Sequence, residues 1–283
     1  MNAKLVASSA RVRVTATRAV RSERGKPLAP HPDELSVEEP LEIRIAGETY
    51  ATTMRTPGSD HELVAGFLLA EGLIRGREDL GSIAHCGRLD AERGENTIDV
   101  LPAPGTVLDA EALDHTRRGT LTSAACGMCG RKLISDLLTW VTPPRPCAPF
   151  ERAFIAGLTS ELGRHQPSFE RTGGLHAAGI ALPDAGFLVV REDVGRHNAV
   201  DKAIGRLLLD QRLPVRAGVL VVSGRTSFEI VQKALAAGLA GVVGVSAPSS
   251  LAVSTAAQFG LFLSGFARGN AFNVYAGAER LAP

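Results

Sequence analysis

The sequence predicts an α/β protein with a mostly parallel main sheet covered by helices on both faces, and a smaller α+β unit ahead of it. Two observations lead to this fold class. In the C-terminal half, short apolar segments alternate with helix-like segments of about ten to fifteen residues, a pattern typical of βαβ units. Before that half, short strand-like segments surround a single helix-like one. With 45% hydrophobic residues in a chain of 283, a sizeable core is expected.

Composition narrows the class of protein. The chain has only four cysteines, so it is not a small disulfide-stapled secreted domain. No signal-like apolar segment occurs over residues 1–20, and no segment approaches the roughly 20 apolar residues that span a bilayer. We therefore expect a cytoplasmic protein whose thiols stay reduced. The net charge of +1 argues against broad binding to nucleic acid or to a membrane.

The N-terminal part is predicted to hold two regions. Residues 1–35 are polar and arginine-rich, and we expect an N-terminal arm that is partly flexible, with an edge strand over 12–20. Residues 36–108 predict the small α+β subdomain. Its helix opens with Ser59 and Glu62 in the spacing of a capping box. The predicted elements are a hairpin over 40–56, a helix from Ser59 to Gly72, and strands over 82–88 and 97–101.

Residues 109–283 predict the larger α/β domain, which carries a cysteine loop. A proline-rich linker over 142–149 separates that loop from the rest. Thr226 and Glu229 are spaced as a second capping box. The predicted helices cover 110–118, 131–141, 150–165, 196–209, 226–237 and 249–259. The predicted strands cover 175–182, 187–191, 218–222, 241–245, 261–266 and 273–275.

The loop Cys126-Gly127-Met128-Cys129-Gly130 is the strongest chemical signal in the chain. Cysteine reacts as the thiolate, and the start of the predicted helix that follows, with Arg131 and Lys132, favours negative charge there. The glycines make the backbone permissive. This spacing suits a redox pair, half of a zinc site or a sulfur carrier, and the alternative without function is a pair of ordinary buried cysteines.

A zinc site is disfavoured by what surrounds the loop. Cytidine deaminases combine Cys-x-x-Cys with an earlier His-x-Glu or Cys-x-Glu, and neither occurs upstream of Cys126. His61 and Glu62 are adjacent, without a spacer, and Ala125 stands where the deaminases have proline. A thioredoxin-like site would lie near the start of its domain, whereas this pair lies mid-chain. We expect no bound metal.

Several predicted strand-to-helix turns carry polar residues that suit an anion. Helix N-termini with glycine and arginine bind phosphate, and such turns contain Arg196 and Ser223-Gly224-Arg225, with Ser246 in a third turn of similar geometry. His197 and Asp201 share a helix face and are expected to line a cleft at one of these turns. The alternative for that cluster is helix capping by Asn198 and a solvated ion pair. The basic, glycine-containing stretch 265–271 either joins the site or forms a bulged hairpin.

These motifs, taken in order, resemble the FdhD family of formate dehydrogenase accessory sulfur carriers. The resemblance runs from about residue 36 to near the C-terminus. It rests on Glu62–Gly72, Cys126–Gly130, Gly174–Ala178, Asp193–Lys202, Ser223–Glu229 and Ser246–Leu251. It implies a cytoplasmic homodimer with a cytidine-deaminase-like, three-layer core that lacks the deaminase zinc. It also implies sulfur transfer from a cysteine desulfurase to the molybdenum cofactor destined for formate dehydrogenase.

The resemblance also implies roles for particular residues. Cys126 would carry the persulfide, with Cys129 as its partner. The cofactor, molybdenum bis-molybdopterin guanine dinucleotide, would be a bound substrate, and GDP would mimic it. The residues expected to bind it are Arg196, His197, Ser223, Gly224, Arg225, Ser246, Phe266, Ala267, Arg268, Gly269, Asn270 and Ala271. Two other classes stay open at this point: a nucleotide-binding regulatory module and a zinc-dependent, deaminase-like hydrolase.

Overall fold

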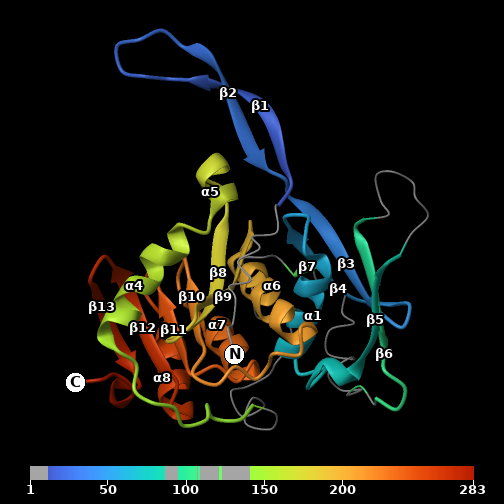
Figure 1. The fold of residues 1–283 in the computed structure, drawn as a ribbon. Coiled ribbons are helices and arrows are strands. Elements are labelled where there is room, and N and C mark those ends of the chain that lie inside the picture. Colours follow the sequence, from blue (N-terminus) through green and yellow to red (C-terminus); the bar gives the residue numbers. More distant parts are fainter. Residues whose placement is uncertain (1–11, 87–94, 107, 109–120, 123–140) are drawn as a thin grey trace.

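The main sheet has six strands in the order β13-β12-β11-β10-β8-β9 (Figure 1). The computed structural model describes residues 12–86, 95–106, 108, 121–122 and 141–283. Valine, isoleucine, leucine and alanine predominate in the central strands, as expected for strands buried on both faces. The six strands are β8 (His176–Leu182), β9 (Gly186–Asp193), β10 (Val219–Val222), β11 (Gly241–Gly244), β12 (Phe262–Arg268) and β13 (Ala271–Ala276).

The sheet is mixed, so the expectation of a mostly parallel sheet was wrong. Only the neighbouring pairs β10–β11 and β11–β12 are parallel. The pairs β8–β9, β8–β10 and β12–β13 are antiparallel. The cause is local, because β8–β9 and β12–β13 are hairpins closed by short turns, and a short turn can join only antiparallel strands. A helix lies between β10 and β11 in the chain, and another lies between β11 and β12, which allows these three strands to be parallel.

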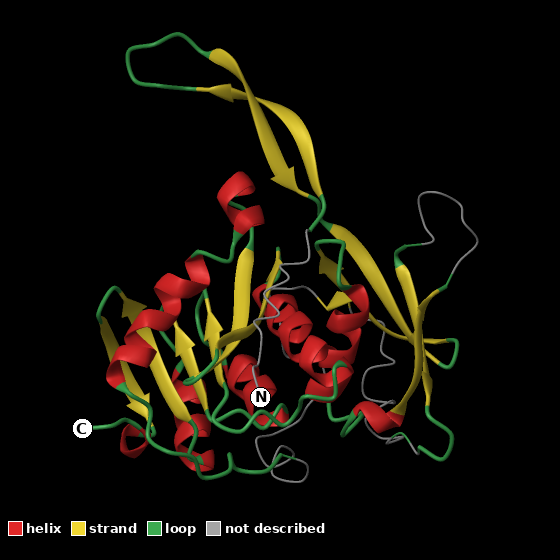
Figure 2. Ribbon diagram, in the orientation of Figure 1, coloured by secondary structure: helices red, strands yellow, loops and turns green. Residues whose placement is uncertain are grey.

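Helices cover both faces of this sheet, which gives three layers (Figure 2). Helix α4 (Arg152–Gly163) packs on one face, against β8, β10, β11 and β12. On the other face lie α6 (Arg196–Leu209), α7 (Phe228–Ala236) and α8 (Ser250–Phe259). Alternate residues of β10 face the two layers: Val219 and Val221 join the cluster beneath α4, while Leu220 and Val222 join the opposite one.

A second, five-stranded sheet lies beyond these helices, in the order β5-β6-β3-β4-β7. Helix α1 (Asp60–Ala70) contacts α6 and α7, and it shares one continuous hydrophobic cluster with β3, β4 and the helices of the main domain. The strands are β3 (Glu39–Ile45), β4 (Glu48–Arg55), β5 (Leu80–His85), β6 (Thr97–Pro102) and β7 (Leu121–Thr122). A short 3-10 helix, Arg77–Asp79, precedes β5, and a second one, Ala278–Arg280, follows β13 near the C-terminus.

Helices α1 and α6 touch at the level of their backbones. A Cβ placed on Gly66 of α1 would lie 2.0 Å from the Asp201 carbonyl oxygen, and one on Gly205 of α6 would lie 1.8 Å from the Glu62 carbonyl oxygen. No side chain fits at either distance, so glycine is required at both positions. The close approach fixes the spacing between the two sheets.

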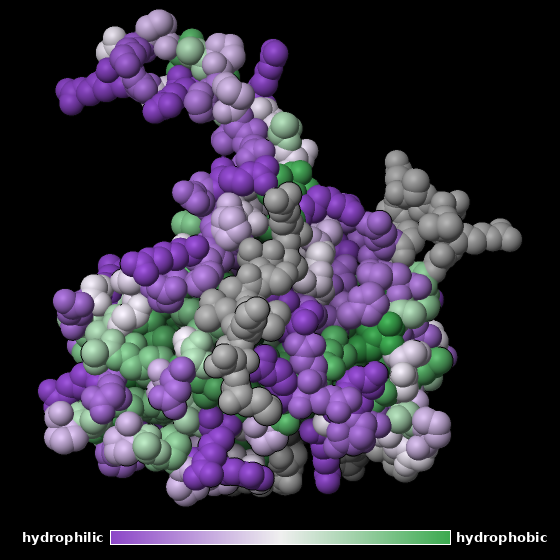
Figure 3. All heavy atoms as spheres, in the orientation of Figure 1, coloured by the Kyte–Doolittle hydropathy of each residue, from purple (hydrophilic) through white to green (hydrophobic). Residues whose placement is uncertain are grey.

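A two-stranded arm projects from the body and is largely hydrophilic (Figures 1 and 3). It pairs β1 (Val14–Arg21) with β2 (Ala29–Ser36), and the second strand was not predicted. Pro30 and Pro32 lie within this strand, and a strand tolerates proline at an edge position where its missing N–H is not needed for a hydrogen bond to the neighbouring strand. Arg171 binds Glu34 at the base of the arm.

Most predicted helices are present with shifted ends, but neither capping box forms. Ser59 precedes α1 in a left-handed conformation (φ 57°) and makes no side-chain cap, while Glu62 binds Arg191. Helix α7 begins after Ser227, so Thr226 does not cap it. The predictions over 110–118 and 131–140 lie outside the described residues. A short helix over Pro167–Thr172, α5, was missed. None of the described helices is long and apolar enough to cross a bilayer.

We expect Gly66→Ala to destabilise the fold by about 3 kcal/mol or more, because the new methyl group meets the α6 backbone. Chemical denaturation would measure the change in the free energy of unfolding. Gly157→Ala on α4 is the matched control, since nothing lies within 4 Å of its Cβ position. It should be neutral or stabilise by up to about 1 kcal/mol. Equal stability of Gly66→Ala and wild type would contradict the backbone contact.

Candidate functional site

The carboxyl ends of the three parallel strands form one edge of the main sheet. Helices α6, α7 and α8 each begin at this edge, after β9, β10 and β11. Helix N-termini carry unpaired N–H groups and partial positive charge, so three of them together favour an anion. We call this edge the strand-end site and define it by His176, Arg196, His197, Ser223, Gly224, Arg225 and Ser246.

Contacts between neighbouring turns connect these residues. Gly224 lies opposite His176 and beside Arg196, since a Cβ on it would be 3.4 Å from His176 Nδ1 and 3.9 Å from Arg196 Cδ. Ser223 Oγ accepts a hydrogen bond from the Ala177 N–H at 2.9 Å. The Ser246 carbonyl accepts from the Phe266 N–H at 3.2 Å. The structure therefore brings together residues from turns that lie far apart in the sequence.

Two arginines give the site its charge. Arg225 is exposed, and Arg196 is partly buried, with an Nε atom that is buried and has no hydrogen-bond partner in the described part of the chain. Burial lowers the pKa of His176, and the nearby Arg196 and Arg225 lower it further against the opposing effect of Asp193. The neutral form of His176 is therefore favoured, so the positive charge of the site comes from the two guanidinium groups.

The stretch 266–271 lies at the β12–β13 hairpin, and its residues differ in exposure. The Phe266 side chain is 46% exposed, in a backbone conformation with φ 51°. Arg268 reaches the Val245 carbonyl at 3.4 Å, which ties the hairpin to the site. Gly269 and Asn270 form the exposed turn, followed by Ala271. The side chain of Ala267 is fully buried against the α4 layer, so only its backbone can meet a ligand.

His197 points into the protein, toward α7. Its Nε2 lies 3.1 Å from Ser227 Oγ and 3.8 Å from Glu229 Oε2, and the residue is 6% exposed. Ser227 stands at the N-cap position of α7, yet its side chain makes no capping bond. The first turns of α6 and α7 are thus joined by a polar contact beside Arg196.

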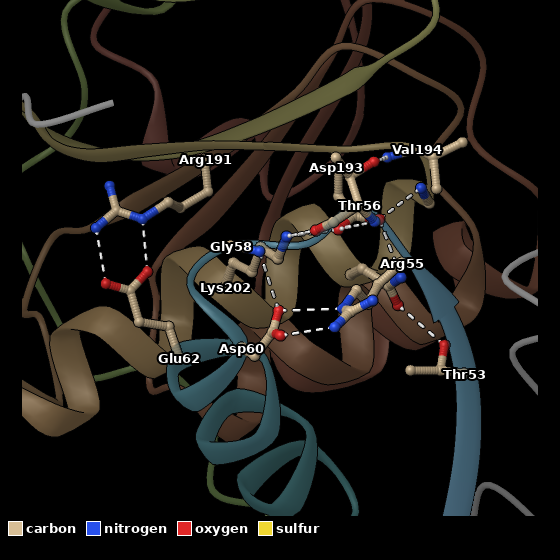
Figure 4. A network of polar contacts seen from close by, with 12 residues as sticks. Thr53, Arg55, Thr56, Gly58, Asp60, Glu62, Arg191, Asp193, Val194 and Lys202 are labelled. Carbon is tan, nitrogen blue, oxygen red and sulfur yellow. Dashed lines mark hydrogen bonds and ion pairs between the residues drawn. The ribbon is translucent and has the colours of Figure 1, made fainter. Parts of the chain in front are cut away.

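A buried carboxylate holds the turn that presents Arg196 and His197 (Figure 4). Asp193 ends β9 and is fully buried. Its Oδ2 lies 2.6 Å from Lys202 Nζ and accepts from the Thr56 N–H at 3.2 Å. Its Oδ1 accepts from the Gly195 N–H at 2.8 Å and from Asn198 Nδ2 at 3.0 Å.

Lys202 completes this clamp by donating to the Thr56 carbonyl at 2.8 Å. Thr56 follows β4, so the clamp joins the two sheets as well as the two ends of the β9–α6 turn. Neighbouring pairs in the same region are also buried: Arg55 binds Asp60 at 2.9 Å, and Arg191 binds Glu62 at 2.5 and 2.9 Å (Figure 4). Asp193, Asp60 and Glu62 are therefore each paired with a cation from another element.

Asp201 does not line a cleft, and that expectation was wrong. It shares the α6 face with His197, as predicted, but this face packs on α7, where Lys233 Nζ lies 2.7 Å from Asp201 Oδ1. Burial raises the pKa of Asp201 to about 6 in spite of Lys233. Asn198 neither caps α6 nor faces solvent, since it donates to the Met54 carbonyl at 2.7 Å and to Asp193.

The cysteine loop, with Cys126 and Cys129, lies outside the described residues. The two other cysteines are free and half-buried. Cys86 follows β5, and Cys147 lies 3.6 Å from an Arg280 guanidinium nitrogen, beside the C-terminal 3-10 helix.

Three residues of this region were not among the predicted site residues: His176, Ser227 and Glu229. His176 lies in a stretch already noted, and a Cβ on Gly224 would lie 3.4 Å from its Nδ1. Ser227 and Glu229 follow Arg225 directly, but the spacing suggested only a helix cap. Ser227 and Glu229 could be recognised as neighbours of His197 only once the positions of α6 and α7 on the sheet were known.

Fold and site together define a mixed α/β protein in which two arginines and three helix N-termini gather at one edge of the main sheet. Comparison with known proteins shows the family to which the chain belongs. The sequence model of the FdhD/NarQ family matches residues 36–282. The chain therefore belongs to the FdhD/NarQ family.

Individual relatives agree with this assignment. The chain is 51% identical over 255 residues to a protein of Anaeromyxobacter dehalogenans named sulfur carrier protein FdhD, covering 88% of both chains. It is 46% identical over 275 residues to a protein of the same name from Streptomyces coelicolor, covering 95% of this chain and 96% of the other. A crystal structure of a formate dehydrogenase accessory protein from Desulfotalea psychrophila shares the fold, with TM-score 0.73 and 23% identity over 95% of this chain and 99% of that one.

Lys202→Met should lower the free energy of unfolding by about 3–5 kcal/mol, because it leaves the Asp193 carboxylate buried without its cation. Urea denaturation would measure this. Arg164→Gln is the control: it breaks the exposed Arg164–Glu161 pair and should change stability by less than about 1 kcal/mol. A change of similar small size for both variants would show that the clamp does not hold the sheets together.

Proposed function

We propose that this protein is a sulfur carrier that serves formate dehydrogenase. The relatives named sulfur carrier protein FdhD support the carrier role, and the Desulfotalea protein's description points to formate dehydrogenase as the client. The structural observation that supports a phosphate-bearing substrate is the convergence of Arg196, Arg225 and three helix N-termini at the strand-end site.

The proposed donor is a cysteine desulfurase that carries a persulfide. The Cys126 thiolate attacks the outer sulfur of that persulfide, the donor's S–S bond breaks, and the desulfurase leaves as a thiolate. Cys126 then holds the sulfur as its own persulfide. For release, either the acceptor takes the outer sulfur directly or Cys129 attacks Cys126 Sγ. In the second route a Cys126–Cys129 disulfide forms and hydrosulfide is set free, so the two electrons gained by that sulfur come from the two thiols.

The proposed substrate is the molybdenum cofactor in its bis-molybdopterin guanine dinucleotide form. Its pyrophosphates suit the charge of the strand-end site, where Arg225 is exposed and the buried Arg196 Nε has no hydrogen-bond acceptor among the described residues. Arginine binds phosphate oxygens through paired N–H groups. Arg268 and the exposed Phe266 ring, at the rim of the site, would contact the remainder of the dinucleotide. We also propose that the protein acts as a cytoplasmic homodimer.

The first test concerns the sulfur. Cys126→Ala should abolish the gain of one sulfur mass after incubation with a cysteine desulfurase and cysteine, because the accepting thiolate is gone. Intact-protein mass spectrometry measures this directly. Cys86→Ala and Cys147→Ala are the matched controls and should load normally. An undiminished yield of persulfide on the Cys126→Ala protein would rule out Cys126 as the sulfur-carrying residue.

The second test concerns the nucleotide. GDP should bind to the wild-type protein, and Arg225→Ala should weaken binding by about tenfold to a hundredfold, since a charge-assisted contact contributes roughly 1.5–3 kcal/mol. Titration calorimetry measures both affinities. Arg164→Ala, an exposed arginine at the end of α4, should bind as the wild type does. Equal affinity of the Arg225→Ala protein and wild type would remove Arg225 from the site.

A further inference from the structure

The arm formed by β1 and β2 leaves the body of the molecule with a strand edge on each side. Figure 1 shows it projecting beyond the rest of the described chain. It meets α5 at its base, where Arg171 binds Glu34 and the hydroxyl groups of Ser36 and Thr172 lie 2.9 Å apart. A sheet of two strands is marginally stable in water, and three or more strands are usually needed. The arm is therefore suited to accept further strands.

One hydrogen bond and the strand register fix the direction of each backbone group on the arm. The Val37 N–H donates to the Arg13 carbonyl at 3.1 Å, so these two residues form a hydrogen-bonded pair just before the ladder. In an antiparallel ladder such pairs alternate with pairs whose N–H and C=O groups point away from the neighbouring strand. The register continues from this pair without a shift. The residues that point outward are therefore Val14, Ala16, Arg18 and Val20 on β1, and Ser36, Glu34, Pro32 and Pro30 on β2.

The outer edge of β2 is closed to another strand. Pro30 and Pro32 have no N–H to donate. The Glu34 N–H donates to Asp33 Oδ1 at 2.9 Å, so it is already used. Proline on an exposed edge is a common way in which proteins prevent strands from adding to a sheet.

The outer edge of β1 has no such protection. The strand contains no proline over its eight residues, and its outward N–H and C=O groups have no hydrogen-bond partner in the described part of the chain. The Val20 side chain at this edge is 66% exposed. A strand with a row of free donors and acceptors is a template for a strand of another chain.

The β1 edge is complementary to itself. When a second β1 lies antiparallel across a twofold axis at Thr17, all four outward residues pair: Val14 lies opposite Val20 of the second copy, and Ala16 opposite its Arg18. Thr17 then lies opposite Thr17, a favourable pair, and no two like charges within β1 are directly opposite. Moving the axis to Arg18 would set two arginines opposite each other and leave Val14 unpaired.

The side chains agree with this register. Val20, which is largely exposed in the single chain, would be covered by Val14 of the second copy. Arg18 would lie in one row with Ala16 and Glu34 of the second copy, with that carboxylate two strand spacings away, about 10 Å between Cα atoms. Because Ala16 is small, the long Arg18 side chain can extend over it toward Glu34.

We propose that two copies of this chain join through their arms, β1 on β1, to form one four-stranded sheet with β2 at both edges. The prolines of β2 then end the sheet, so assembly stops at two copies. At each end of the pairing Arg13 meets Arg21 of the second copy, and each of these arginines already binds a carboxylate. The inference rests on the homodimer proposed above and adds its interface, but it does not depend on sulfur transfer.

Sedimentation of the full chain over a range of concentrations measures the dissociation constant of the dimer. Ala16→Pro removes one outward donor from each arm and leaves the β1–β2 ladder intact, because the Ala16 N–H points away from β2. It should raise that constant by about tenfold to a hundredfold. Ala16→Ser is the matched control at the same position: it keeps the N–H and should sediment as the wild type does.

A cross-link tests the register. Mild oxidation should join two Thr17→Cys chains, because the Cα atoms of a directly opposite, non-hydrogen-bonded pair are about 4.5 Å apart, within disulfide range. Thr15→Cys, on the same face of β1, is the matched control. In the proposed register Thr15 lies about 13 Å or more from its own copy, which is too far for a disulfide. Peptide mass spectrometry distinguishes this bond from disulfides of the four native cysteines.

A dimer that Ala16→Pro leaves intact, with no cross-link in Thr17→Cys, would overturn this interface and leave the homodimer to another surface. A wild-type chain that stays monomeric at every concentration would overturn both, and would leave the β1 edge to an extended segment of another protein. Persulfide loading is scored separately. Its absence in the wild type would overturn the carrier role, while a cross-link in Thr17→Cys would still establish the pairing of the arms.

Discussion

The arrangement of the two sheets depends on the hydrogen bonds and the ion pair that the buried Asp193 carboxylate makes. It is fully buried and accepts from the backbone of Thr56 and Gly195, from Asn198 and from Lys202. A buried charge is tolerated only when it is paired and its hydrogen-bonding capacity is used. One side chain therefore positions the first turn of α6 and attaches the five-stranded sheet to the six-stranded one. The strand-end site inherits its geometry from this clamp.

Local sequence patterns predicted most elements of the larger domain, because periodicity and turn residues lie within a few positions of one another. The helix over 196–209 has the predicted bounds. The errors came from interactions that are distant in sequence. Glu62 has the spacing of a helix cap but pairs with Arg191, 129 residues away. Strand β2 was missed because its prolines are acceptable only once β1 is placed beside it.

The same distinction applies to the site. Glycine and arginine at strand-to-helix turns indicated an anion site, and the fold places those turns along one edge. Asp201 was misassigned because its partner, Lys233, lies on α7, and the residues around Asp201 in the sequence do not show that α7 packs against it. His197 was predicted as a site residue, but its contacts with Ser227 and Glu229 arise only from the packing of α6 on α7. Which polar residues meet is a property of the tertiary structure.

The backbone contact between Gly66 and Gly205 has a consequence for how a large ligand enters and leaves. Helices that touch without intervening side chains cannot slide or rotate past each other without collision. The contact therefore opposes a hinge motion between the two sheets. A ligand of the kind proposed for the strand-end site would have to enter and leave while the spacing between the two sheets stays unchanged.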